Sequence, residues 1–173
     1  MTHIPCLFGI LNITTDSFSD GGAYLDSEKA LEQARTLHAD GAEIIDIGPA
    51  SSHPDSTPVS AQTEIDRLTT IVPALKALNI PISIDSYQTQ TQRWALQQNV
   101  DWMNDIHGFA DPALYSDLAA SDCRLVVMHA IQSAGAATRT APPAGDIFDH
   151  ICRFFDTRLT ELTKAGIDQT RIV

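Results

Sequence analysis

The sequence lacks the patterns that would point to a membrane or to secretion. It contains no run of about eighteen apolar residues, and no basic segment precedes an apolar one near its start. Positive charge is also scarce, because 11 Lys and Arg residues face 22 Asp and Glu residues, for a formal net charge of -11. A chain of this charge repels polyanions at long range. We therefore expect a cytoplasmic protein that binds neither membranes nor nucleic acid.

Cysteine is scarce as well. Cys6, Cys123 and Cys152 are odd in number, far apart in the chain and free of any C-x-x-C pair. This pattern argues against a disulfide framework and against a zinc site. We predict that all three thiols are reduced and buried.

Short apolar segments alternate with longer segments whose apolar residues recur at helical spacing. The short segments, typical of buried strands, are residues 6–11, 43–47, 82–84, 100–103 and 125–128. The predicted helices begin at Asp26 or Ser27, at Ser60, at Thr89, at Asp111 and at Asp146. Residues 171–173 are predicted to begin a sixth strand. Phe154 and Phe155 of the last helix are predicted to pack as outer-layer core.

Strictly alternating strands and helices predict a parallel sheet with right-handed crossovers, either open and doubly wound or closed into an eightfold barrel. Polar residues fall at or near the carboxyl ends of the predicted strands: Asn12, Asp46, Asp85, Asn104, Asp105 and His129. A barrel gathers such ends on one rim, which favours the barrel. The absence of Gly-x-Gly-x-x-Gly and of Gly-Lys-Ser/Thr weakens the nucleotide-binding alternative.

The predicted fold class is therefore α/β, a TIM (β/α)8 barrel. Such a barrel needs roughly 250 residues, whereas this chain has 173. We expect about five βα units plus the start of the sixth strand, so that residues 1–173 form the N-terminal part of one domain.

The segment 9–22 carries the first candidate site. It reads Gly-Ile-Leu-Asn-Ile-Thr-Thr-Asp-Ser-Phe-Ser-Asp-Gly-Gly, so that Asn12 ends an apolar strand and a loop of acidic and hydroxyl side chains surrounds Phe18. An amide oxygen beside such a loop suits a hard cation or a substrate that carries an anion.

This segment resembles the signature of the dihydropteroate synthase family, G-I-L-N-V-T-P-D-S-F-S-D-G-G, and departs from it only at Ile13 and Thr15. Blocks at 46–48, 83–85, 104–106 and 128–129 also resemble that family, in family order. The resemblance implies a pterin-binding barrel that joins 6-hydroxymethyl-7,8-dihydropterin diphosphate to p-aminobenzoate, giving 7,8-dihydropteroate and diphosphate for folate synthesis. It also implies a homodimer for the full-length form.

The resemblance assigns roles residue by residue. Asn12 corresponds to the ligand of a Mg²⁺ ion that accompanies the diphosphate, and Asp85 and Asn104 correspond to pterin ligands. A carboxylate and an amide suit the clustered donors and acceptor of an amino-pyrimidine edge. Ile106 and Met128 would line the flat faces of the pterin ring.

Two loops carry the residues expected to act on the diphosphate and the aromatic amine. Asp16 and Phe18 belong to the first loop, which closes over both groups in the family. Ser52 and His53 of the second loop stand where most relatives have Thr-Arg, and histidine cannot reproduce the guanidinium fork. The segment 48–54, Gly-Pro-Ala-Ser-Ser-His-Pro, resembles the sulfonamide-insensitive branch of the family, so we expect tolerance to sulfonamides.

Two alternatives stay open. One is a methyltransferase of the related pterin-binding barrels, which the S-F-S-D-G-G loop disfavours. The other is a non-catalytic half-barrel that binds pterin or a protein partner through its open edges. The family's later D-P-G-x-G-F, S-R-K and R-x-H blocks do not occur in this sequence, so we expect a truncated part of a larger enzyme that is inactive by itself.

Overall fold

The computed structural model describes residues 5–14, 23–51, 56–132, 135 and 139–173. Five parallel strands form one sheet in the order β1-β2-β3-β4-β5, each strand pairing with the next along the chain. The strands are β1 Phe8–Asn12, β2 Ile44–Gly48, β3 Ile82–Asp85, β4 Trp102–Asp105 and β5 Arg124–Val127. The predicted parallel α/β arrangement is confirmed.

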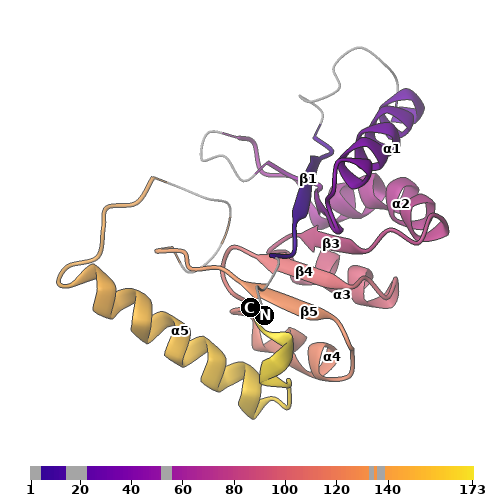
Figure 1. The fold of residues 1–173 in the computed structure, drawn as a ribbon. Coiled ribbons are helices and arrows are strands. Elements are labelled where there is room, and N and C mark those ends of the chain that lie inside the picture. The colour runs from indigo at the N-terminus through magenta and orange to yellow at the C-terminus, as the bar shows by residue number, and fades with distance from the viewer. Residues whose placement is uncertain (1–4, 15–22, 52–55, 133–134, 136–138) are drawn as a thin grey trace.

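Helices follow the strands in strict alternation, and Figure 1 shows the first four covering one side of the sheet. The helices are α1 Ala23–Ala39, α2 Ala61–Ala77, α3 Thr89–Gln97, α4 Tyr115–Ala119 and α5 Ile147–Lys164, with 3-10 turns η1 Pro112–Leu114 and η2 Gln169–Arg171. Three predicted caps are confirmed. Ser60, Asp111 and Asp146 each accept a hydrogen bond from a backbone N–H two or three residues later.

The first helix and the sixth strand begin at other residues than predicted. Helix α1 begins at Ala23, so the predicted caps Asp26 and Ser27 lie inside it; nothing in residues 23–25 opposes a helix, and it extends past both candidate caps. Arg171 belongs to η2, and only Ile172 pairs with β5, through a parallel bridge to Leu125. The Val173 N–H donates to the Leu125 carbonyl at 2.9 Å.

The core lies between the sheet and the helices. Alternate strand side chains point to opposite faces, and the helix-facing set is almost fully buried: Leu11, Ile45, Ile47, Ile82, Ile84, Met103 and Leu125. Each such side chain contributes about 1.5–3 kcal/mol through burial. The other face, which we call the inner face, carries Ile10, Asp46, Ser83 and Trp102 in one row of neighbouring strand positions.

Outside the sheet, one prediction on aromatic residues is confirmed and one on cysteines is partly wrong. Phe154 and Phe155 pack against the core as expected. Cys123 is buried, but Cys6 and Cys152 are exposed, because Cys6 precedes β1 and Cys152 is on the outward side of α5. No helix in the described part of the chain is long and apolar enough to cross a membrane.

Candidate active site

The inner face ends in a second row of side chains, at the carboxyl ends of the strands. Asn12 is paired with Gly48, and Asp85 with Asn104. A methyl group on Gly48 would lie 2.7 Å from the side-chain oxygen of Asn12, so the glycine leaves room for that oxygen. The strand register thus brings together three residues predicted from the sequence.

Three buried polar atoms on the inner face make no hydrogen bond with the described residues: Asp46 Oδ1, Ser83 Oγ and Asn104 Oδ1. Burial raises the pKa of Asp46 above its ordinary value, although nearby Ser83 and Asn104 favour its charged form. Buried polar groups are normally paired, because leaving one unpaired costs about 1–3 kcal/mol. This cluster is therefore suited to a ligand that brings its own donors and acceptors.

Asp85 lies beside this cluster and has the most perturbed carboxyl of the site. Burial, together with the charges of Asp46, Asp105 and Glu64, raises the pKa of Asp85 to about 7. Desolvation and like charges both disfavour a carboxylate. A ligand that donates hydrogen bonds to Asp85 would favour the charged form and lower this pKa again.

Behind the inner face, a buried polar network supports the strand ends. The Ser86 hydroxyl donates to Glu64 Oε2 at 2.6 Å, and the Gln92 amide donates to the Ser86 carbonyl and to Asp105 Oδ2. Asp105 also accepts the backbone N–H groups of His107 and Phe109, at 2.7 and 3.0 Å. The network fixes the turn after β4.

Asp105 ends β4 and His129 follows β5 by two residues, so both lie at the carboxyl ends of strands as predicted, but neither side chain joins the inner-face cluster. Each follows an inner-face residue, and the alternation along a strand turns it to the helix side. The His129 ring packs against Phe154 and His150 of α5, with ring centroids 4.9 and 5.4 Å apart.

Glu64 was missed by sequence reasoning although a signal for it exists. It shares the buried stripe of α2 with Leu68, Ile71 and Leu75. A carboxylate at helical spacing within an apolar stripe must have a buried partner.

The remaining predicted site residues divide into two groups. Ile106 is half-buried after β4, and Met128 is 41% exposed after β5. The loop residues predicted to be catalytic lie outside the described part of the chain: Asp16, Phe18, Ser52 and His53.

Asn12, the one predicted metal ligand, is suited to a Mg²⁺ ion. Among the described residues no group of three or more His, Cys, Asp and Glu side chains could hold a metal. Asn12 offers a single, exposed amide oxygen with space kept by Gly48. Mg²⁺ often keeps several waters and takes few protein ligands beside substrate phosphates, so one amide is compatible with it.

A parallel sheet with strands in sequential order, and with carboxylate and amide groups at their carboxyl ends, is typical of part of a ligand-binding barrel. The family described as "Pterin binding enzyme" matches residues 8–173. The chain belongs to this family, and its five βα units correspond to part of a TIM barrel.

Several relatives of the chain are dihydropteroate synthases. The chain is 56% identical to dihydropteroate synthase type-2 of Escherichia coli over 96% of its own length and 61% of the relative's. It is 48% identical to dihydropteroate synthase type-3 of Escherichia coli, covering 64% of that protein. The chain thus spans about three-fifths of the length of these relatives.

Solved structures of dihydropteroate synthases also match the chain. The dihydropteroate synthase of Burkholderia cenocepacia, complexed with 7,8-dihydropteroate, matches 99% of this chain and 57% of its own, with a TM-score of 0.82 and 32% identity. The enzyme of Xanthomonas albilineans with 4-aminobenzoic acid matches 97% of this chain and 59% of its own, with a TM-score of 0.85 and 30% identity.

Proposed function

We propose that the protein is a dihydropteroate synthase, which condenses 6-hydroxymethyl-7,8-dihydropterin diphosphate with p-aminobenzoate. The observation that carries this proposal is the unpaired cluster of Asp46, Ser83 and Asn104 beside Asp85. The amino-pyrimidine edge of a pterin supplies in-plane donors and an acceptor at the spacing of amide and carboxylate groups. The similarity to named synthases supports the same substrate.

In the proposed reaction the bond between the pterin methylene carbon and the diphosphate oxygen breaks. The amine nitrogen of p-aminobenzoate forms the new bond to that carbon and loses a proton. Because diphosphate is itself a good leaving group, the reaction needs no protein nucleophile. Asp85 and Asn104 hold the ring edge, while Ile106 and Met128 border its faces. These residues position the methylene carbon for attack.

Asn12 would hold Mg²⁺, which supplies charge neutralisation for the departing diphosphate when bound. Asp16 and Phe18 are proposed to cover the diphosphate and the amine, and Ser52 and His53 to contact them from the second loop. A homodimeric assembly belongs to the same proposal, because it rests on the resemblance to the synthase family. The proposal also includes the cytoplasmic location expected from the sequence.

The test uses protein expressed from the whole reading frame. Formation of dihydropteroate is measured with radiolabelled p-aminobenzoate and the pterin diphosphate, with Mg²⁺ present. Asp85→Asn is expected to lower kcat/KM about ten- to a hundredfold through lost charge-assisted hydrogen bonds. Asp66→Asn, on the exposed side of α2, removes the same charge and should leave kcat/KM unchanged.

Three outcomes would contradict the proposal. One is the absence of dihydropteroate. The second is methyl transfer from a methylated folate to a corrinoid partner, which would identify the protein as a methyltransferase. The third is pterin binding without either reaction, which would identify a non-catalytic binding barrel.

A further inference from the structure

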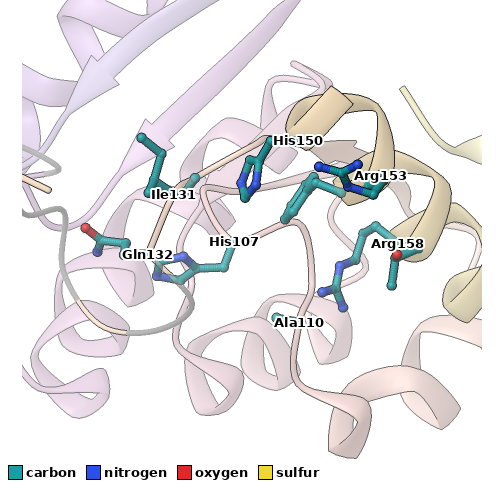
Figure 2. Close-up of a pocket in the computed structure, with 10 residues that line it drawn as sticks. His107, Ala110, Ile131, Gln132, His150, Arg153 and Arg158 are labelled. Carbon is teal, nitrogen blue, oxygen red and sulfur yellow. The ribbon is translucent and has the colours of Figure 1, made fainter. Parts of the chain in front are cut away.

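A pocket of about 390 Å³ lies on the helix side of the sheet, away from the inner face. It is bordered by residues after β4, by residues after β5 and by α5 between His150 and Arg158. Figure 2 shows lining side chains of the pocket, among them His107, Ile131, His150, Arg153 and Arg158. Phe154 lines it as well. We call it the α5 pocket.

The α5 pocket is lined by basic side chains, in a chain that is otherwise acidic. Two of the 11 Lys and Arg residues and two of the 6 His residues line it. No Asp or Glu is among its lining residues in the described part of the chain. Arg153 makes no hydrogen bond or ion pair with any described residue, and Figure 2 shows it and Arg158 extending from α5 on the side of His150 and His107.

Arg158 is held in place through Nη1, while its buried Nε donor stays unused among the described residues. Its Nη1 group donates to Glu161 at 2.7 Å and to the Tyr115 hydroxyl at 3.2 Å. Its Nε atom is buried without a partner. A guanidinium N–H can only donate, so this atom requires an acceptor that the described residues do not provide.

Two more buried nitrogens at or beside the pocket, His107 Nδ1 and His129 Nε2, make no hydrogen bond within the described part of the chain. His107 Nε2 is 2.7 Å from the Gly135 carbonyl oxygen, and because a carbonyl only accepts, we assign the hydrogen to Nε2. His107 Nδ1 then accepts in the neutral ring. His129 packs directly against His150 and Phe154.

We propose that the α5 pocket binds a small organic phosphate. The phosphate oxygens would accept from Arg158 Nε and from Arg153, and a phosphate O–H could donate to His107 Nδ1. Such ligands are the usual partners of a guanidinium. Ile131 and Phe154 form an apolar wall for the organic part. The volume exceeds what inorganic phosphate alone would fill, which favours a phosphate monoester. This site is separate from the proposed synthase site and does not depend on it.

The test is isothermal titration calorimetry at fixed ionic strength, with phenyl phosphate and inorganic phosphate as probes and protein from the whole reading frame. Arg153→Met should weaken phenyl phosphate binding at least about fivefold. Arg35→Met removes the same charge from exposed α1, beside the opposite edge of the sheet, and should change nothing. Because Arg153 has no described partner, its substitution does not threaten folding.

Asn12→Ala separates the two sites, since it alters only the strand-end site and should leave phenyl phosphate binding intact. The proposal is wrong if neither probe binds up to about 10 mM, a range that covers weak ligands. It is also wrong if Asn12→Ala abolishes binding while Arg153→Met does not. Inorganic phosphate binding as tightly as phenyl phosphate would overturn the assignment of an organic ligand.

Discussion

At the scale of single residues, Asp85 connects stability to pH. Its pKa is raised to about 7 in the folded protein, whereas an unfolded aspartate loses its proton near pH 4. Between these values the folded state binds more protons than the unfolded state. The contribution of Asp85 to stability therefore falls as pH rises from about 4 to 7, by at most about 4 kcal/mol.

Asp85→Asn removes the cost of ionising this buried carboxyl in the folded protein. We expect it to raise the melting temperature by several degrees at pH 8 and to change it little at pH 4. Thermal denaturation at both pH values measures the effect, with Asp66→Asn as the exposed control. An equal shift at the two pH values would show that the carboxyl is not perturbed as described.

His53 carries the other prediction at this scale. Because a histidine stands where most of the family has arginine, we expect the protein to make dihydropteroate at sulfamethoxazole concentrations that inhibit a sensitive relative. His53→Arg should increase inhibition, by restoring the guanidinium fork. Dose–response curves for both forms and for a sensitive relative provide the measurement, and identical curves for the unchanged protein and that relative would refute the prediction.

At the scale of elements, the turn after β4 depends on one carboxylate. Asp105 accepts from two backbone N–H groups and from Gln92, all buried. Asp105→Ala leaves three donors unpaired, so we expect a loss of about 3–5 kcal/mol.

Asp111→Ala is the matched comparison for Asp105→Ala. It removes an exposed cap and should cost about 1 kcal/mol. Urea denaturation of the two variants compares them directly. A loss at Asp105 no larger than that at Asp111 would contradict the structural role of the network.

The strands and helices show which parts of the fold could be predicted from the sequence. The order of strands and helices could be predicted, because short apolar runs indicate buried strands and apolar residues spaced three or four apart indicate helices. It was harder to predict which face of the sheet a side chain at a strand end points to. Asp105 and His129 lie one position beyond an inner-face residue, and a shift of one position reverses the face.

The site was predictable where a family motif coincides with a strand end, as at Asp85 and Asn104. Ser83 was not singled out, because its importance depends on a neighbour in another strand. Glu64 stands out by its place in the apolar stripe of α2, but the sequence does not show which polar group pairs with it. Ser83 is beside Asp46 in the sheet, and Glu64 is bonded to Ser86 across 22 residues of sequence. Such contacts arise only from the tertiary fold.

At the scale of the whole molecule, stability should decrease from the middle of the sheet toward β1. All five residues of β2 are buried, whereas Ile10 of β1 is 67% exposed. In the described part of the chain β1 pairs with β2 alone. We expect hydrogen exchange to be slowest in β2 to β4 and faster in β1. Peptide-resolved exchange by mass spectrometry tests this, and equal protection of β1 and β2 would contradict it.

The unpaired atoms on the inner face also bear on the fate of the protein in the cell. Without a ligand, Asp46, Ser83 and Asn104 leave polar atoms unsatisfied, and any molecule that satisfies them stabilises the folded state by mass action. Proteases degrade the unfolded fraction, so a modest gain in stability changes abundance several-fold. The amount of this protein should therefore rise and fall with the supply of its ligand, even at a constant rate of synthesis.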